Sequence, residues 1–455
     1  MVDEKKIQKQ LFGTNGVRGV SGRDMTPELV LHIGEALGSM RKGTIAVGRD
    51  TRTSGEALAS AVKAGLMATG CDVVDVGVLP TPALQYIVKL GFDGGAMITA
   101  SHNPPEYNGV KIIEADGTEM GDEEVIKLER RLFDLDFTLA SWDQAGSEEA
   151  APHLLGQYID AIAAQFPAGI GEGITVVVDP GSGPATRTTP AILERLGCRV
   201  FTINATLDGT FPGRLPEPTP EGLVPLAELV LSTGAAFGVA HDGDADRAVF
   251  IDDKGRYIEE NHEFALIARQ VCSERKGILV TPVSSSLLIE DVAAEQGCSV
   301  LYTPVGSVYV ARKMIELIAN GEAVAFGGEG NGGLIYPDLQ FCRDGGMTAA
   351  TMVAILGTLK RSLSDLVDDL PPYVSIKNKI RTPDIPGLLA AVEEHFKNEK
   401  VDRTDGLRIS RGKTWALVRA SGTEPLVRVT IESDKREAAE AFNSEILGVT
   451  ARFTA

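Results

Sequence analysis

Short apolar runs alternate with longer stretches of helical periodicity along most of the chain, and this alternation limits the folds that it can adopt. Residues 44–48 (TIAVG) and 73–77 (VVDVG) each have the composition of a buried strand. Thr26 and Pro27 have the character of an N-cap and a first helical residue, so a helix is predicted from there to about Met40. Strands that alternate with helices build parallel sheets covered by helices, so the sequence predicts the α/β class.

The alternating pattern is interrupted once and then changes character. Residues 136–152 are polar and irregular, which predicts a linker, and the strand–helix pattern restarts after them. Pro371-Pro372 breaks the chain a second time, and the remainder carries clustered strands with few helices. A length of 455 residues suggests about three domains, give or take one. The predicted domains are residues 1–150, 151–254, 255–370 and 371–455, the first three of the α/β type and the last a smaller α+β unit.

Charge and hydropathy restrict the partners of this chain. It has 63 acidic and 44 basic residues and a formal net charge of −19, which argues against binding nucleic acid or an anionic membrane. A phosphate ligand stays compatible, because it needs only local Arg, Lys and backbone N–H groups. No apolar run approaches the roughly 20 residues of a membrane span, and the N-terminal MVDEKKIQKQ lacks the apolar segment of a signal peptide. We therefore expect a cytoplasmic protein.

The cysteines give no sign of a metal site or a disulfide framework. There are five of them, widely spaced, and none forms a CxxC pair. An odd number of scattered cysteines is typical of buried, reduced thiols in a cytosolic protein.

A first candidate site is the segment TASHNPPEYNGVK at residues 99–111. Ser101 follows an apolar strand, and ligands of open α/β sheets bind at such strand ends. Two prolines after it stiffen the backbone and hold the serine outward. A hydrolase is disfavoured, because neighbours on an extended segment point to opposite sides and His102 would be a poor base for Ser101. The segment also lacks a G-x-S-x-G elbow. A serine that accepts and returns phosphate and a simple capping serine remain as interpretations.

A second candidate site is HDGDADR at residues 241–247. Asp242, Asp244 and Asp246 alternate, so they project to one side of an extended loop. Three crowded carboxylates raise one another's pKa unless a cation lies among them, and few oxygen ligands suit Mg²⁺. An EF-hand is disfavoured, because that loop needs further ligands and a bidentate Glu, whereas this segment enters a strand. A solvated acidic turn is the alternative. Arg247 would neutralise remaining charge or contact phosphate.

Two further loops and two short segments offer polar groups suited to a sugar phosphate. GGEGNGG at 327–333 carries a carboxylate and an amide two residues apart, which can bind neighbouring hydroxyls. RASGTEPLVR at 419–428 offers a guanidinium, hydroxyls and backbone N–H groups for a phosphate monoester. LFGTNGVRG at 11–19 and GRDTR at 48–52 add arginines. Ordinary turns and surface ion pairs are the alternatives for these four segments.

In this order and spacing, the four loops resemble the α-D-phosphohexomutase superfamily, which includes phosphoglucosamine mutases and phosphomannomutase/phosphoglucomutases. The resemblance covers essentially the whole chain, with one signature loop in each domain. It implies four domains around a central cleft, the last similar to a TATA-binding-protein-like α+β unit. It also implies an intramolecular phosphotransferase that interconverts hexose 6-phosphate and hexose 1-phosphate through a phosphorylated serine and a bisphosphorylated sugar.

The resemblance assigns roles to individual residues. It implies that Ser101 is the phosphoserine and that its phosphate oxygen joins Asp242, Asp244 and Asp246 around Mg²⁺. Lys111 matches a general acid/base, which requires a neutral amine at one stage, and we expect a cationic, desolvated site to lower its pKa. The implied neighbours of the reacting phosphate are Arg18, His102 and Arg247. The other implied substrate-binding residues are Glu329, Asn331, Arg419, Ser421, Gly422, Thr423 and Arg428.

The loops also bear on the choice of sugar. The family's sugar loop usually reads GE-x-SGH, whereas here Asn331 stands in place of Ser and Gly333 in place of His. SGTEP in the fourth loop and TPVGSVYV at 303–310 resemble the phosphoglucosamine mutases. We therefore expect glucosamine 6-phosphate as substrate, with mannose or glucose phosphate as the alternative.

Two other functions compete with a mutase. A Mg²⁺-dependent phosphatase would use the same serine but release phosphate to water. A catalytically silent sugar-phosphate sensor is disfavoured by the intact Ser101 and aspartate trio. We expect a monomer or a homodimer that acts on a small sugar phosphate.

Overall fold

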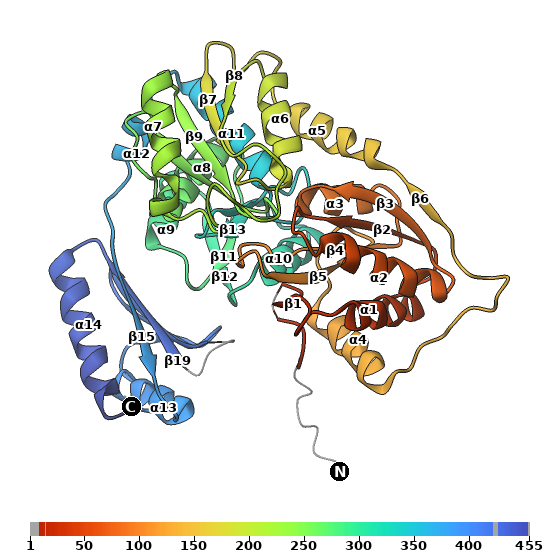
Figure 1. The fold of residues 1–455 in the computed structure, drawn as a ribbon. Helices are drawn as coiled ribbons and strands as arrows, with labels where there is room; N and C mark the ends of the chain where they lie inside the picture. The colour runs from red at the N-terminus through yellow and green to blue at the C-terminus, as the bar shows by residue number, and fades with distance from the viewer. Residues whose placement is uncertain (1–8, 14, 422–425, 454–455) are drawn as a thin grey trace. The chain divides into compact units, whose positions relative to one another are not determined.

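The chain folds into two compact units. The computed structural model describes residues 9–13, 15–421 and 426–453. One unit comprises Met1–Glu259 and Asn331–Leu366, and the other comprises Glu260–Gly330 and Val367–Ala455 (Figure 1). The sheets confirm the predicted class of three α/β regions followed by an α+β region.

The first sheet carries the serine segment. Its order is β1-β5-β4-β2-β3-β6, with β2, β3, β4 and β6 parallel and β5 antiparallel to β4 and β1. The strands are β1 (Val17–Val20), β2 (Thr44–Arg49), β3 (Asp72–Val78), β4 (Gly94–Ile98), β5 (Tyr107–Glu114) and β6 (Glu148–Ala150). The helices are α1 (Pro27–Met40), α2 (Gly55–Ala68), α3 (Thr81–Val88) and α4 (Asp122–Asp134). Apolar residues of α1, α2 and the central strands form one core.

Two local predictions for this region can be compared with the structure. Thr26 caps α1 by accepting a hydrogen bond from the backbone N–H of Leu29, and Pro27 is the first helical residue, as predicted. The segment 136–152, predicted as an irregular linker, is wrong in part because it contains β6, which pairs with β3. The side chains of β6 are exposed, so its sequence carries no apolar signal.

The second sheet carries the acidic loop. Its order is β10-β9-β7-β8, and the antiparallel pair β9 and β10 brackets residues 242–247. The strands are β7 (Thr175–Asp179), β8 (Arg199–Thr202), β9 (Phe237–His241) and β10 (Ala248–Asp252). The helices around it are α5 (Leu155–Ala163), α6 (Thr189–Arg195), α7 (Val224–Thr233) and α11 (Gly345–Leu359). Short 3-10 helices lie at η1 (Pro152–Leu154), η2 (Pro184–Arg187) and η3 (Pro220–Leu223).

The segment after residue 331 returns to the first unit. β14 (Gly333–Ile335) and α11 belong to it, whereas α12 (Leu363–Asp368) spans the boundary between the units. Tyr158 on α5 donates a hydrogen bond of 2.7 Å to Asp344, the N-cap of α11. Nearly every side chain in the first three turns of α11 is buried, which explains why its apolar residues cover all sides rather than one stripe. The predicted domain at 255–370 is thus divided between the two units.

The second unit contains a parallel sheet and an antiparallel one. The parallel strands β11 (Ile278–Pro282), β12 (Ser299–Thr303) and β13 (Val324–Glu329) alternate with helices. These helices are α8 (Glu260–Glu274), α9 (Leu287–Glu295) and α10 (Ser307–Ala319). The antiparallel order is β15-β19-β18-β17-β16. Its strands are β15 (Val374–Arg381), β16 (Lys400–Asp402), β17 (Leu407–Arg411), β18 (Thr414–Ala420) and β19 (Leu426–Ser433).

One face of the antiparallel sheet packs on helices. The other packs in part on apolar residues of the parallel-sheet region through Trp415 and Leu417, and also carries polar residues. α13 (Ile385–His395) and α14 (Arg436–Thr450), which η4 (Ala451–Phe453) follows, form a core with the alternate strand residues. Ile380, Val427 and Val418 belong to this core. Lys379, Arg428 and Arg419, each one residue away along its strand, therefore lie on the opposite face.

The cysteines and the lengths of the helices bear on two further sequence predictions. All five cysteines are free, and four are buried, as predicted, with Cys298 intermediate. Within the described part of the chain, none of the helices has both the length and the apolar character that crossing a bilayer demands.

Candidate functional site

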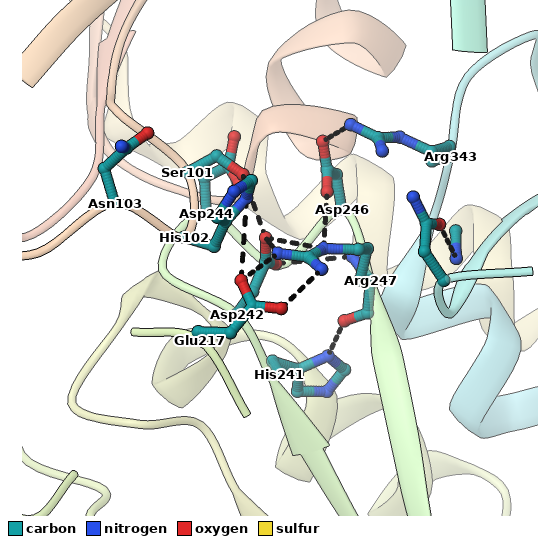
Figure 2. Close-up of polar contacts among 12 residues, drawn as sticks. Ser101, His102, Asn103, Glu217, His241, Asp242, Asp244, Asp246, Arg247 and Arg343 are labelled. Atoms are coloured by element: carbon teal, nitrogen blue, oxygen red, sulfur yellow. Dashed lines mark hydrogen bonds and ion pairs between the residues drawn. The ribbon is translucent and has the colours of Figure 1, made fainter. Parts of the chain in front are cut away.

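Ser101 lies just beyond the end of β4, at the tip of the first sheet. Its side chain is buried, and its backbone is left-handed with φ of 50°. Its N–H donates to Thr99 Oγ1 at 2.9 Å, and its Oγ donates to Asp242 Oδ2 at 3.0 Å (Figure 2). Gly243 permits this approach, because a Cβ there would lie 2.3 Å from the Ser101 carbonyl oxygen. The serine and acidic loops, 141 positions apart for this pair, thus meet in one site.

Asp242, Asp244 and Asp246 form a compact, buried cluster between β9 and β10. One oxygen from each lies within 4.8 Å of the others. Asp244 Oδ1 and Asp246 Oδ1 are buried and accept no hydrogen bond from any residue that the structure describes. Buried carboxylate oxygens without donors are costly unless a cation binds them. The trio therefore fits a divalent metal ion.

Three cationic side chains surround the aspartates. Lys111 on β5 donates to Asp244 Oδ2 at 2.8 Å and to Asp246 Oδ2 at 3.0 Å. Arg343 donates to Asp246 Oδ2 at 2.5 Å, and Arg247 donates through Nε to Asp242 Oδ2 at 3.1 Å (Figure 2). The site therefore holds cationic and carboxylate side chains in contact. The cations can bind a dianionic phosphoryl group, and the carboxylates beside them offset their charge, so that the group can also be released.

The pKa values of Asp242 and Asp246 are shifted in opposite directions. Burial raises the pKa of Asp242 to about 7. Burial also acts to raise the pKa of Asp246, but Arg343 and Lys111 outweigh it and hold that pKa below its usual range. The two carboxyls thus differ because Asp246 has the closer cations.

The environment of Lys111 differs from the one we expected. Burial acts to lower the pKa of Lys111, but Asp244, Asp246 and Glu119 outweigh burial and raise it above its usual value. We expected a cationic site that lowers the pKa of Lys111. That expectation is wrong, because the side chains around Lys111 are mainly carboxylates. The sequence could not show this, because Lys111 meets these aspartates only through folding.

His102 lies closer to Ser101 than an extended segment would place it. Its Nδ1 is 3.5 Å from Ser101 Oγ, because the left-handed backbone at Ser101 turns the two side chains toward each other. His102 Nδ1 also lies 3.7 Å from Glu217 Oε2. In a catalytic triad the serine and the carboxylate contact different ring nitrogens, whereas here both lie near the same one. Burial and Arg247 lower the pKa of His102 to about 4. The premise of opposite sides was wrong, but the hydrolase arrangement is still absent among these residues.

Arg18 also lies beside the serine segment. From β1 it donates through Nη1 to Asn103 Oδ1 at 3.1 Å. Burial lowers the pKa of its guanidinium, although Asp244 and Asp246 oppose this. The structure therefore brings together Ser101 and the other predicted residues of the reacting site, which are Arg18, His102, Lys111, Asp242, Asp244, Asp246 and Arg247.

Several contacts of this site were not predicted from sequence. Glu217 accepts both terminal nitrogens of Arg247 at 3.0 Å each, from a loop with no recognisable motif. Thr81, at the start of α3, donates to Asp244 Oδ2 at 2.5 Å. Its position directly after a strand was an available signal. Arg343 gave none, since it approaches from a segment remote in sequence.

The predicted sugar-binding and phosphate-binding residues are divided between the two units. Glu329 ends β13 in the second unit and is buried. Asn331, in the first unit, accepts the N–H of Gly333 at 3.1 Å, so one of its acceptor positions is used locally. Ser421 donates its N–H to the Leu426 carbonyl at 2.8 Å. Gly422 and Thr423 lie outside the described residues.

Three cations stand side by side on the face of the antiparallel sheet that is opposite the helices. Arg419 on β18 lies opposite Arg428 on β19, and Arg428 lies opposite Lys379 on β15. Asp405 accepts Arg419 Nε at 2.9 Å and the N–H of Val305 at 3.0 Å. Directly opposed like charges repel one another, and a bound anion relieves that repulsion. This cation row, Lys379, Arg428 and Arg419, therefore suits a phosphate, and Lys379 was not predicted.

Known proteins resemble this chain over almost its whole length. Sequence profiles of phosphoglucomutase/phosphomannomutase alpha/beta/alpha domains I, II and III match residues 9–139, 156–255 and 259–373, and that of the C-terminal domain matches 377–449. A phosphoglucomutase/phosphomannomutase of Thermococcus kodakarensis is 44% identical over 449 residues, covering 95% of this chain and 96% of the relative. A probable phosphoglucosamine mutase of Methanopyrus kandleri is 41% identical, covering 97% and 98%.

Solved structures agree with the sequence comparison. A phosphoglucomutase/phosphomannomutase family protein from Burkholderia thailandensis superposes with a TM-score of 0.86 at 28% identity, covering 96% of each chain. A putative phosphomannomutase from Thermus thermophilus gives 0.81 at 27% identity, covering 98% of each. With all four domain profiles matched in order and relatives similar over almost the full length, this chain belongs to the phosphoglucomutase/phosphomannomutase family.

Proposed function

We propose that this protein is a phosphohexomutase that carries the transferred phosphoryl group on Ser101. The observation that supports this most is the 3.0 Å hydrogen bond from Ser101 Oγ to Asp242, a member of the buried aspartate trio. A nucleophilic oxygen, a metal-binding cluster and cationic side chains in one place meet the needs of phosphoryl transfer, which depends on positioning and charge neutralisation. Family membership supports the same activity.

We propose Mg²⁺ as the metal, held by Asp242, Asp244 and Asp246 together with an oxygen of phosphorylated Ser101. Hard carboxylate oxygens and few protein ligands are the preferences of this ion. Bound there, Mg²⁺ would neutralise charge that develops on the transferring phosphoryl oxygens.

The proposed cycle balances over two transfers. The bond from phosphorus to Ser101 Oγ breaks as a bond forms to a free sugar hydroxyl, whose proton passes to Lys111. Accepting that proton requires a neutral Lys111, and because the carboxylates beside it favour the ammonium, we expect a cation bound among them to offset their charge. The resulting bisphosphate turns within the protein so that its other phosphate faces Ser101. Ser101 Oγ then attacks that phosphate, and a proton returns to the released sugar oxygen. Arg18, His102 and Arg247 are proposed to bind the reacting phosphate, and Arg419, Ser421, Gly422, Thr423 and Arg428 the other.

Glucosamine 6-phosphate is the proposed substrate, with Glu329 and Asn331 contacting the sugar. The SGTEP and TPVGSVYV segments and the relatives named probable phosphoglucosamine mutase favour it. The relative from Thermococcus kodakarensis is named phosphoglucomutase/phosphomannomutase, so glucose and mannose phosphates are the alternative. A coupled assay across the 6-phosphates of glucosamine, glucose and mannose decides between them by kcat/KM.

The same assay separates the rival functions. Free inorganic phosphate released in proportion to substrate consumed, without isomerised sugar phosphate, would identify a phosphatase. Absence of turnover on all three sugars, with unphosphorylated Ser101 in peptide mass spectrometry after incubation with glucose 1,6-bisphosphate, would identify a sensor. A cytoplasmic location and a monomeric or homodimeric state stay predictions, the second of which light scattering measures directly.

Lys111 provides a test of the proton transfer. We expect Lys111→Ala to lower kcat by about 10²- to 10⁴-fold with KM nearly unchanged, because the sugar hydroxyl loses its proton acceptor. Lys111→Arg keeps a positive charge beside Asp244 and Asp246 but holds its proton, so it should be as slow. Lys127→Ala, on the exposed side of α4, is the control. Turnover of Lys111→Arg close to that of the unchanged protein would contradict the role.

Lys379 tests the cation row. We expect Lys379→Gln to raise KM for the sugar phosphate about tenfold with little change in kcat, since a charge-assisted hydrogen bond to phosphate is lost. Lys377→Gln is the matched control, because Lys377 lies on the same strand face but opposite Thr430 instead of Arg428. Steady-state kinetics of both variants measure the difference. Equal KM values would show that Lys379 does not contact the phosphate.

A further inference from the structure

Arg52 is a buried arginine whose side chain is directed into the serine segment. Its side chain has no solvent exposure. Nη2 donates to the carbonyl oxygens of Ser101 at 2.8 Å and Asn103 at 2.6 Å. Nη1 donates to the carbonyl oxygens of Pro104 at 2.6 Å and Tyr107 at 2.8 Å. One guanidinium thus satisfies four carbonyl groups within seven consecutive residues that lie beyond β4 and have little regular structure.

The guanidinium is itself held in place by Asp50. Arg52 Nε donates to Asp50 Oδ2 at 3.1 Å, and the Arg52 N–H donates to Asp50 Oδ1 at 2.9 Å. Thr99 Oγ1 also donates to Asp50 Oδ2, at 2.6 Å, and in turn accepts the N–H of Ser101. The backbone of Ser101 is therefore fixed on both sides, through its N–H by Thr99 and through its carbonyl by Arg52.

Arg52 also contacts the loop that leads to Glu217. The Phe211 ring lies 5.4 Å from the guanidinium carbon, and Arg52 forms a parallel backbone bridge with Gly209. A Cβ at Gly209 would lie 2.2 Å from the Thr51 carbonyl oxygen, so the two segments are in close contact. This same loop presents Glu217 to Arg247 beside the aspartate trio.

We propose that Arg52 is a positioning residue for phosphoryl transfer, which sets the left-handed conformation of Ser101 and the place of its Oγ against Asp242. The inference rests on the proposed function of Ser101 as phosphoryl carrier. A left-handed φ at a residue with a side chain is strained and persists only where the surroundings enforce it. Four hydrogen bonds from one rigid, planar group supply that constraint, and a lysine ammonium, with three donors and no plane, does not reproduce it.

A merely structural arginine would act differently from a positioning one. Loss of a structural contact lowers the fraction of folded protein, and the molecules that stay folded keep their turnover. Loss of positioning leaves substrate binding in place and slows transfer to and from Ser101, since a displacement of about 1 Å can cost about 10²-fold in rate. The division of the effect between kcat and KM in folded protein therefore separates the two roles.

The test compares Arg52→Lys and Asp50→Asn in the full-length chain with Mg²⁺. We expect Arg52→Lys to lower kcat by about tenfold to a hundredfold with KM within about twofold, per folded molecule. Phosphorylation of Ser101 by glucose 1,6-bisphosphate, followed by intact-protein mass spectrometry, should slow in parallel. Asp50→Asn, which is isosteric but loosens Arg52, should act in the same direction by a smaller factor. Added guanidinium should restore part of the rate to Arg52→Ala.

Arg408→Lys is the control for loss of a buried guanidinium. Arg408 is also buried, in the second unit, and contacts Tyr302. We expect it to lower the melting temperature while Ser101 is phosphorylated at the normal rate. Folded Arg52→Lys with normal kcat and normal phosphorylation would overturn the proposal, and should that variant not fold, normal values for Asp50→Asn would do so. If the protein without any substitution turned over none of the three hexose phosphates, the proposed function itself would be refuted.

Discussion

Ser101→Ala is expected to lower mutase turnover by about 10⁴-fold or more, because the substitution removes the oxygen that forms the covalent phosphoenzyme. Binding of the sugar phosphate should persist, since the cationic groups around the site are untouched. The variant should also stay unphosphorylated after incubation with glucose 1,6-bisphosphate. Steady-state kinetics, ligand binding by calorimetry and intact-protein mass spectrometry measure the three quantities.

A control is needed for the loss of a buried hydroxyl. Ser285 is equally buried and its Oγ lies 2.5 Å from Thr281 Oγ1, away from the aspartate loop in sequence and in a different unit. Ser285→Ala should keep turnover near that of the unchanged protein. Ser101→Ala that retained a tenth or more of normal turnover would rule out a serine-bound phosphoryl group.

Removal of divalent cations is expected to lower turnover by about 10³-fold or more, since the charge on the transferring group would lose its main neutralising partner. Added Mg²⁺ should restore activity to the chelated protein. It should also raise the melting temperature, because binding to the folded state at about 100 times Kd stabilises by about 2.7 kcal/mol. Both responses should be lost in Asp244→Asn, whose amide leaves one carboxylate fewer in the trio.

The two responses to Mg²⁺ have separate uses. Thermal stabilisation reports binding without reference to catalysis, so it can be measured on Ser101→Ala as well. An unchanged melting temperature and full activity after exhaustive chelation would show that the trio does not hold an essential metal. Stabilisation of Asp244→Asn equal to that of the unchanged protein would place the metal elsewhere.

Local chemistry accounts for what the sequence predicted correctly. The strands that end at Ile98 and His241 are continuous apolar runs, so the sequence itself places the polar residues after them at sheet edges. The alternation of Asp242, Asp244 and Asp246 predicted that the three carboxylates share one side of the loop, and one oxygen from each does lie within 4.8 Å of the others. These features depend only on residues a few positions apart, and the structure brings them together as predicted.

The features that sequence could not predict depend on distant contacts. Glu217 and Arg343 act through partners that are 30 and 97 positions away, and neither lies in a recognisable motif. Arg52 lies in the GRDTR segment, but the carbonyl groups that it contacts begin 49 positions away, at Ser101. Surface ion pairing was the alternative interpretation of the GRDTR segment, and it does not hold for Arg52, whose side chain is fully buried. β6 was missed because all its residues are exposed. The left-handed Ser101 was missed because its strain is imposed by the surrounding hydrogen bonds, and the residue type gives no sign of it.

The cation row has a consequence for the conditions under which this protein works. Neighbouring strands bring Lys379, Arg428 and Arg419 to adjacent positions on one face of the sheet. We expect this row of cations to attract small dianions, so sulfate or phosphate buffer should compete with a substrate phosphate there. Mobile ions screen exposed charges within about 8–10 Å at ordinary ionic strength, so the apparent affinity for substrate should fall as salt rises. We therefore expect substrate binding to depend on the ionic composition of the medium.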